Sequence, residues 1–255
     1  TPVFHCSYDN SKSDSRGAGE YQITPDGLTS DNYDIHYHPG TLTVEKKKLT
    51  FKPETRQGSY SYGSRFNTGS EVTYSTSGLA YDDTASAFSG TPEYEISGLG
   101  RTSDDLISSP AGEYKITMSM KDFKSDDYYF ASADGTLTVT KLSLTVKGIK
   151  TSDRVYDGTD EVHRDQIVLP EFNTTNYQGL QQLDVDYAND DSTGLTAENA
   201  IDVTGKYKTG KDVQMDPNGK AKAKDVELRL TLGDYLSSRY DLTSNVFDTT
   251  STINR

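Results

Sequence analysis

Apolar residues alternate with threonine and serine along several short stretches of this chain. Residues 41–44 read Thr-Leu-Thr-Val, and residues 136–140 read Thr-Leu-Thr-Val-Thr. A period of two places the apolar side chains on one face of a β-strand and the hydroxyl groups on the other. Threonine suits such strands because its β-branched side chain favours extended backbone. The pattern therefore predicts a protein built mainly of half-buried strands.

The same pattern predicts where the individual elements lie. We expect strands at residues 49–53, 70–74, 93–97, 112–118, 135–140, 143–147, 166–169, 184–187, 213–215 and 226–232. A short helix is expected at residues 102–107, because Ser103 can cap its first turn, acidic residues follow, and Pro110 would end it. Further helical candidates are residues 179–183 and 196–201. The predicted fold class is mainly β with minor helix.

Two blocks of sequence occur twice. Gly-Glu-Tyr-x-Ile-Thr begins at residues 19 and 112, which are 93 residues apart, and Gly-Thr-Leu-Thr-Val begins at residues 40 and 135, which are 95 apart. A repeat of this length corresponds to one small domain and is too long for a solenoid repeat. The chain is therefore predicted to be a tandem array of small β-rich domains.

Domain boundaries are expected near Lys47 and Lys141. Residues 1–47 contain only the C-terminal half of the repeat or form an atypical first domain. Residues 48–141 contain one complete copy, and residues 142–255 form a longer, divergent copy. The last strand of each copy runs almost directly into the next copy, and linkers this short leave little slack. We therefore expect an elongated array.

Composition narrows the possible functions. The chain has a net charge of −13 and a pI near 4.7, which argues against binding to nucleic acid or to anionic membranes. Only 32% of its residues are hydrophobic, tryptophan is absent, and there are 18 tyrosines but 8 phenylalanines, as in small β-domains with thin cores. Cys6 is the single cysteine, so no internal disulfide can form. We expect the sequence to be a portion of a longer chain.

Taken together, the repeated blocks resemble the MBG family of modules. Tyr62-Gly63 falls where the Tyr-Gly-x type of this family carries its signature, and Val155-Tyr156-Asp157-Gly158-Thr159 is similar to the related YDG module. The resemblance spans most of residues 17–255. It implies tandem MBG-type modules followed by a YDG-type module, from a surface adhesin of lactobacillus-like Gram-positive bacteria. It also implies β-grasp-like modules, with immunoglobulin-like sandwiches as the alternative.

The resemblance implies a non-catalytic role outside the cell. We expect an extracellular region on the bacterial cell wall that mediates or extends adhesion to host mucin or to epithelial glycans and glycoproteins. A purely structural stalk and an accessory polysaccharide-binding region of an extracellular enzyme are the alternatives. The neighbouring modules are the other expected partners. No cofactor, nucleic acid or membrane insertion is expected, and we expect a monomer. The sequence contains no hydrolase or phosphate-binding signature, so no enzyme is expected.

The signature residues are expected to be structural. Tyr62 and Gly63 belong to one signature, and Tyr156, Asp157 and Gly158 to the other. Asp-Gly favours a tight turn, in which the aspartate accepts hydrogen bonds from backbone amides and glycine adopts positive φ. The Tyr156 ring would then pack under the sheet. The tyrosines that recur with the repeat are expected in the core: Tyr21, Tyr33, Tyr114, Tyr128 and Tyr240.

A smaller set of residues is a candidate for binding. Tyr81, Tyr177 and Tyr187 lie outside the repeat pattern and could stack on sugar rings. A calcium ion needs six to eight oxygen ligands, and the best candidates are Asp184, Asp186, Asp190 and Asp191. Solvated acidic loops are the competing interpretation of these aspartates. A Lys–Asn or Lys–Asp isopeptide cross-link is also conceivable.

Overall fold

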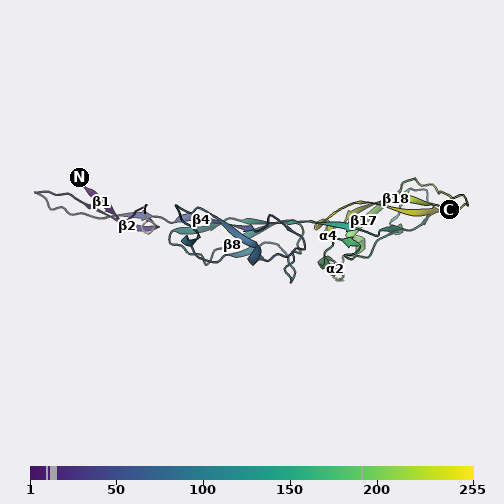
Figure 1. Ribbon diagram of the computed structural model, residues 1–255, viewed down its shortest axis with the longest axis horizontal. Coiled ribbons are helices and arrows are strands. Elements are labelled where there is room, and N and C mark those ends of the chain that lie inside the picture. Colours follow the sequence, from purple (N-terminus) through teal and green to yellow (C-terminus); the bar gives the residue numbers. More distant parts are fainter. Residues whose placement is uncertain (10, 12–15, 191) are drawn as a thin grey trace. The chain divides into compact units, whose positions relative to one another are not determined.

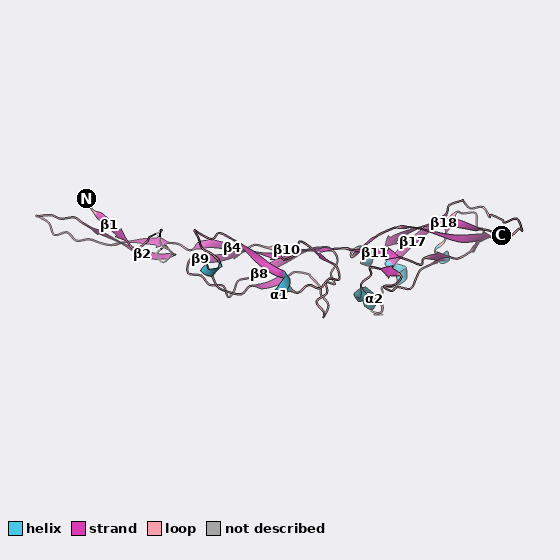
Figure 2. Ribbon diagram, in the orientation of Figure 1, coloured by secondary structure: helices cyan, strands magenta, loops and turns pink. Residues whose placement is uncertain are grey.

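The computed structural model describes residues 1–9, 11, 16–190 and 192–255. It is mainly β, with 44% strand and 10% helix (Figure 2), which confirms the predicted class. The chain forms two compact units. Unit 1 consists of Thr1–Gly58, Asn67–Ser97 and Tyr114–Leu137, and unit 2 of Ser59–Phe66, Gly98–Glu113 and Thr138–Arg255. Among the described residues, no helix has the length and apolar character needed to cross a bilayer.

The first sheet of unit 1 has three antiparallel strands in the order β1-β2-β3 (Figure 1). These are β1 (Val3–Cys6), β2 (Gly19–Asp26) and β3 (Gly40–Val44). Phe4 lies opposite Pro25, and Tyr21 lies opposite Leu42. None of the described apolar side chains on these strands is fully buried, and Phe4 is 65% exposed.

The second sheet of unit 1 has β4 at its centre. β4 (Lys47–Thr55) pairs antiparallel with β6 (Val72–Ser77) and parallel with β9 (Tyr128–Ser132). The other elements are α1 (Thr68–Glu71), η1 (Ala85–Ala87), β7 (Glu93–Ile96) and β8 (Gly112–Ser119). Leu49, Phe51, Met118, Phe123 and Tyr128 form the core. The Phe51 ring contacts four other aromatic rings at centroid distances of 5.1–5.8 Å.

Unit 2 repeats the second sheet of unit 1. β11 (Leu142–Val146) pairs antiparallel with β16 (Tyr177–Gln178) and parallel with β19 (Tyr240–Leu242). Thus β16-β11-β19 has the arrangement of β6-β4-β9, including the parallel strand that begins at a tyrosine, Tyr240 or Tyr128. One strand arrangement therefore occurs in both units.

A five-stranded sheet completes unit 2, in the order β13-β20-β18-β17-β14. Its strands are β13 (Arg154–Val155), β14 (Glu161–Val162), β17 (Ile201–Tyr207), β18 (Ala223–Leu232) and β20 (Val246–Asn254). The remaining elements of unit 2 are β5 (Tyr60–Ser61), β12 (Lys150–Thr151), β15 (Ile167–Val168), η2 (Arg164–Gln166), α2 (Gln182–Ala188), α3 (Ala197–Ala200) and α4 (Asp234–Ser237). Strand β10 (Gly135–Thr140) begins with three residues of unit 1 and ends with three of unit 2. Alternate residues of β17 and β18 are buried, as in a half-buried sheet.

Three of the expected elements are wrong. Residues 184–187 lie in helix α2 instead of a strand. Residues 102–107 form a turn instead of a helix, because Asp105 adopts a positive φ of 60°. Residues 213–215 form no regular strand and contribute only an isolated bridge between Met215 and Ala221.

Two of the expected core tyrosines are also exposed. The Tyr33 ring is 78% exposed, and the Tyr156 ring, expected under the sheet, is 44% exposed. Tyr128 and Tyr240 are buried as expected, with 2% and 1% exposure. Tyr128 and Tyr240 are buried because each begins a strand that pairs with the central strand of its sheet, β4 or β11. Tyr33 lies in no strand, and no described residue buries its ring.

Candidate functional site

The Tyr-Gly and Tyr-Asp-Gly motifs occupy equivalent places in the fold. β5 pairs in parallel with the end of β10, and the Tyr62 amide donates to the Thr140 carbonyl oxygen (2.9 Å). β13 pairs in parallel with the end of β20, and the Tyr156 amide donates to the Asn254 carbonyl oxygen (2.8 Å). Each motif therefore begins where a two-residue parallel strand leaves the last strand of a sheet.

The first motif is buried against a carboxylate. Tyr62 is 1% exposed, and its hydroxyl donates to Oδ1 of the fully buried Asp184 (2.6 Å). The Tyr235 hydroxyl donates to the same oxygen (2.8 Å), and the Tyr240 hydroxyl donates to Oδ2. We call these four residues the Asp184 cluster. Three donors satisfy the carboxylate, which is how a fold tolerates a buried aspartate.

The surroundings of the Asp184 cluster keep its tyrosines neutral. The Arg239 guanidinium, which lies 4.0 Å from the Tyr235 ring centroid and 5.5 Å from that of Tyr62, acts against this by lowering the pKa of Tyr235, but burial outweighs it. Burial raises the pKa of Tyr62, Tyr235 and Tyr240 well above the ordinary tyrosine value, and the nearby carboxylate raises it further. A neutral hydroxyl can donate a hydrogen bond, so the raised pKa preserves the cluster.

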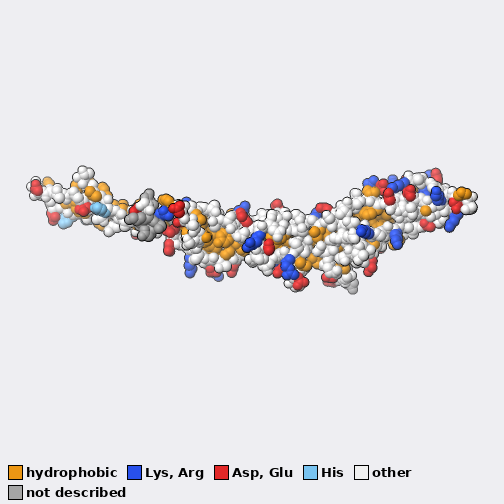
Figure 3. Space-filling model, viewed as in Figure 1, with side chains coloured by type: hydrophobic (Ala, Val, Ile, Leu, Met, Phe, Trp, Pro, Cys, Tyr) orange, Lys and Arg blue, Asp and Glu red, His pale blue; other side chains and the backbone are white. Residues whose placement is uncertain are grey.

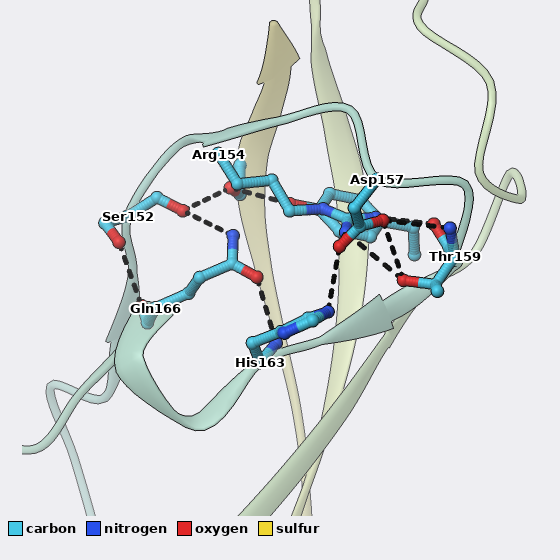
Figure 4. A network of polar contacts seen from close by, with 8 residues as sticks. Ser152, Arg154, Asp157, Thr159, His163 and Gln166 are labelled. Atoms are coloured by element: carbon cyan, nitrogen blue, oxygen red, sulfur yellow. Dashed lines mark hydrogen bonds and ion pairs between the residues drawn. The ribbon is translucent and has the colours of Figure 1, made fainter.

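The second motif forms an exposed loop held by a polar network (Figure 4). Asp157 Oδ1 accepts from the Thr159 amide and from the Thr159 hydroxyl, both at 2.9 Å. Asp157 Oδ2 pairs with the Arg154 guanidinium and lies 2.9 Å from His163 Nε2. Gly158 has a φ of +87°, which a residue with a side chain rarely adopts. The expected hydrogen bond from a backbone amide to Asp157 and the positive φ at Gly158 are therefore present, in a bend of the chain at residue 158.

Arg154 provides the electrostatic support of this loop. Its side chain is only 7% exposed, its Nη1 donates to Thr159 Oγ1 (3.2 Å), and its guanidinium lies 5.1 Å from the Tyr207 ring centroid. The Thr159 amide, with smaller contributions from the Thr159 hydroxyl and the Arg154 guanidinium, lowers the pKa of Asp157 to about 2. Asp157 is consequently ionised throughout the physiological pH range.

A chain of hydrogen bonds ties the loop to the rest of unit 2 (Figure 4). The His163 amide donates to Gln166 Oε1 (2.9 Å), and Gln166 Nε2 donates to the Ser152 carbonyl oxygen (3.4 Å). The same carbonyl accepts from the Ser251 hydroxyl on β20 (2.7 Å). The loop is thus fixed at both ends while Val155 and Tyr156 stay 66% and 44% exposed.

A groove lies along β14, β17 and β18, near the loop. Its volume is about 380 Å³. Six charged side chains line it: Glu161, Arg164, Asp202, Lys206, Glu227 and Arg229. Such a mixture of donors and acceptors suits a neutral polar ligand rich in hydroxyl groups, because such a ligand can use both kinds of partner.

The structure separates the three tyrosines predicted to stack on sugars. Tyr81 is 68% exposed, and the Arg16 guanidinium lies 4.5 Å from its ring centroid. Tyr187 is 42% exposed on one side and stacks on Tyr235 on the other, with 4.8 Å between ring centroids. Tyr177 is fully buried, which raises its pKa to about 12, so its ring offers no face to a ligand.

The three described calcium candidates, Asp184, Asp186 and Asp190, each have other hydrogen-bond partners. Asp184 is occupied by the three tyrosines, Asp186 accepts from Gln182 Nε2 (2.9 Å), and Asp190 accepts from Ser192. Asp191 lies outside the described residues. Within the described part of the chain, no group of three or more His, Cys, Asp or Glu side chains is arranged to hold a metal ion.

Sequence reasoning did not single out Arg154, His163 or Gln166. Their positions relative to Asp157 depend on the parallel pairing of β13 with β20, which joins residues about 100 positions apart. The signal available in the sequence was the spacing of Arg154, Asp157 and Thr159 around one tight turn. That spacing allows an ion pair but does not show that the arginine is buried.

An MBG domain of the YGX type is found at residues 4–43. This segment contains β2 and nearly all of β1 and β3, and it includes the first copy of Gly-Glu-Tyr-x-Ile-Thr. A comparison with curated proteins gives no match.

Proposed function

We propose that this chain is a non-catalytic repeat region of a bacterial cell-surface adhesin, which mediates or extends adhesion to glycans of host mucus or epithelium. The observation that carries the proposal is the MBG domain at residues 4–43, which suggests a repeat or adhesin-like region. The recurrence of its sequence blocks at residues 112–117 and 135–139 supports a tandem role. The region would then act outside the cell, as part of a wall-attached Gram-positive protein.

The geometry of unit 2 offers a place for a glycan. The groove of Glu161, Arg164 and Lys206 provides charged hydrogen-bonding groups, and Tyr156 offers a partly exposed aromatic ring in the neighbouring loop. Aromatic rings stack on the apolar faces of sugars, while polar groups bind the hydroxyls. Single sites of this kind bind weakly, and tandem display raises the overall affinity through effective concentration.

The Asp157 network supports a structural role better than a catalytic one. A carboxylate beside an imidazole can serve as an acid–base pair. Here both Asp157 oxygens already accept from Thr159 or pair with Arg154, and these contacts hold the loop. The carboxylate therefore serves to fix the shape that presents Val155 and Tyr156.

The test is a binding screen of the full chain against purified mucin, host-cell surfaces and a glycan array. We expect saturable binding that weakens at least about tenfold in Tyr156→Ala and in Arg164→Ala. Tyr129→Ala is the matched control, since Tyr129 is a 53% exposed tyrosine of unit 1. If the chain binds to none of these three surfaces, the adhesive role is rejected and a structural spacer is favoured. An equal loss in Tyr129→Ala would reject the proposed place of binding.

A further inference from the structure

A groove in unit 1 lies where the Asp184 cluster has its counterpart. Its volume is about 360 Å³. Val44 and Glu45 line it at the end of β3, and Arg16 and Ala18 line it before β2. Asp83 lines it from the turn after β6 and Tyr128 from the start of β9, and Tyr8 and Tyr81 also border it. The Ala18 amide donates to Asp127 Oδ1 (2.6 Å), so the groove continues an existing contact between the two sheets.

Asp83 and Tyr128 correspond to Asp184 and Tyr240. The Tyr128 hydroxyl donates to Asp83 Oδ2 (2.5 Å) and accepts from the amide three residues before that aspartate, Ala80 (2.8 Å). The Tyr240 hydroxyl donates to Asp184 Oδ2 and accepts from the amide three residues before it, Gln181 (3.0 Å). Both tyrosines begin the parallel strand of equivalent sheets. One tyrosine–aspartate arrangement is therefore built twice.

The two copies differ in the group that contacts Oδ1 of the aspartate. In unit 2 the Tyr62 hydroxyl occupies Asp184 Oδ1, and the aspartate is fully buried. In unit 1 the side chain of Asp83 is 29% exposed, and its Oδ1 has the Arg16 guanidinium 3.9 Å away. Among the described residues, no hydroxyl donates to Asp83 Oδ1, the place that the Tyr62 hydroxyl takes in the other copy.

The strand beside the groove also has an open edge. β10 and β3 share the sequence Gly-Thr-Leu-Thr-Val. β10 receives the parallel strand β5, with Tyr60 opposite Val139 and Ser61 opposite Thr140. Among the described residues, β3 pairs with β2 alone, and its counterparts of Val139 and Thr140, Val44 and Glu45, line the groove. An exposed strand edge of this kind can accept an added strand.

We propose that this groove binds an extended Tyr-x-Tyr-Gly segment of another polypeptide, which adds in parallel to β3 and donates its second tyrosine hydroxyl to Asp83. The segment copies residues 60–63 of this chain: its first tyrosine lies opposite Val44, and the amide of its second tyrosine donates to the Glu45 carbonyl oxygen. The carboxylate supplies the acceptor that the incoming hydroxyl needs. The inference does not depend on glycan binding.

Glycine after the tyrosine is part of the recognition. Gly63 has a φ of +73°, and a Cβ there would lie 2.7 Å from Gln181 Cγ. The positive φ is the reason that glycine is needed, because residues with a side chain rarely adopt it. In unit 1 the counterpart of Gln181 is the small Ala80, which lines the groove. A Tyr-x-Tyr-Gly segment that adopts the backbone of residues 60–63 therefore needs glycine at this position and meets a smaller side chain there.

The experiment uses the full chain and a fluorescent peptide of residues 57–66, Gln-Gly-Ser-Tyr-Ser-Tyr-Gly-Ser-Arg-Phe. We expect a saturable rise in fluorescence anisotropy. Asp83→Asn should weaken binding at least about tenfold, because a hydrogen bond to a charged acceptor is lost. Asp82→Asn is the matched control, since it removes the same charge from the adjacent, exposed side chain. Equal affinity of the two variants would overturn the proposal.

Two altered peptides keep the test valid if Asp83→Asn does not fold. Replacing Tyr62 of the peptide by Phe removes only the hydroxyl, and N-methylation of that tyrosine removes only the strand hydrogen bond. Each should weaken binding to the unaltered protein at least about fivefold. A photoreactive group at Tyr60 of the peptide should cross-link to residues 42–47. Cross-linking to residues 139–141, which would mean displacement of β5, or no saturable binding, would overturn the proposal.

Discussion

Replacing Asp184 by asparagine should destabilise unit 2 selectively. The carboxylate is fully buried and accepts from the hydroxyls of Tyr62, Tyr235 and Tyr240. Asparagine has nearly the same shape but only one acceptor oxygen, and its amide group would face a hydroxyl oxygen. At least one of the three hydrogen bonds is then lost or reversed.

The magnitude follows from the kind of hydrogen bond that is lost. A hydrogen bond to a charged group contributes about 1.5–3 kcal/mol, and a buried donor left without an acceptor costs about 1–3 kcal/mol. Asp184 has no exposed surface, so solvent does not screen these contacts. We therefore expect Asp184→Asn to lower the free energy of unfolding of unit 2 by about 2–3 kcal/mol. Tyr62→Phe, which removes a single donor, should lower it by about 1.5 kcal/mol.

Hydrogen exchange measured by mass spectrometry can assign this loss to one unit. Strands β11, β16 and β19 should exchange about 30- to 150-fold faster in Asp184→Asn, as expected from 2–3 kcal/mol. Strands β4 and β6 of unit 1 should be unchanged. Asp186→Asn is the control on the same helix, because Asp186 is exposed and the same charge is removed. The reasoning fails if the two variants exchange alike, or if unit 1 loses as much protection as unit 2.

Three further predictions concern pH and backbone packing. Burial raises the pKa values of the tyrosines in the Asp184 cluster, so the stability that they contribute is present below about pH 10 and is lost as the pH rises above it. Absorbance at 295 nm should therefore show that these tyrosines ionise only when unit 2 unfolds. Gradual ionisation while unit 2 stays folded would contradict this. Because hydrogen bonds from Thr159 and the ion pair with Arg154 lower the pKa of Asp157 to about 2, the loop should persist as the pH falls through 4 and loosen only near pH 2. The Thr159 amide resonance, followed by NMR, should shift with a midpoint near pH 2. A midpoint near pH 4 would contradict the prediction. Gly135→Ala should lower the free energy of unfolding of unit 1 by about 2 kcal/mol, and with it the melting temperature, because the new Cβ would overlap the Pro53 carbonyl oxygen. Gly58→Ala should change the melting temperature little, because no atom lies within 4 Å of the Cβ at that position.

Alternation of apolar residues was enough to predict the long strands. Residues 112–118 and 135–140 were expected to be strands and form β8 and β10, with Ile116 and Leu137 fully buried. The same rule missed β17, in which Gly205 interrupts the apolar series. A Cβ at Gly205 would lie 2.5 Å from Leu228 Cδ2, so the glycine is part of the packing. A pattern of side-chain hydrophobicity contains no signal for a position that must lack a side chain.

The prediction of residues 184–187 failed because of a buried polar group. Val185 and Tyr187 alternate with Asp184 and Asp186 as in a strand, a pattern that places both aspartates on the solvent face. In helix α2 the Asp184 carboxylate instead points to hydroxyls from three separate segments of the chain. Those partners lie 51 to 122 residues away in sequence. Local patterns cannot show such partners, and without them burial of Asp184 would have been too costly to predict.

A tyrosine that recurs with the repeat is buried only where a neighbouring strand covers it, as a comparison of Tyr33, Tyr128 and Tyr240 shows. Tyr128 and Tyr240 each donate to an aspartate and begin a strand that pairs with β4 or β11. Tyr33 has the same sequence position in the repeat, but no described strand pairs there, and its ring is 78% exposed. The repeat therefore encodes the tyrosine, while the neighbouring sheet determines its burial. The same reasoning applies to β3, whose sequence matches β10 but which pairs, among the described residues, with no counterpart of β5. An added Tyr-x-Tyr-Gly strand would supply at β3 what β5 supplies at β10.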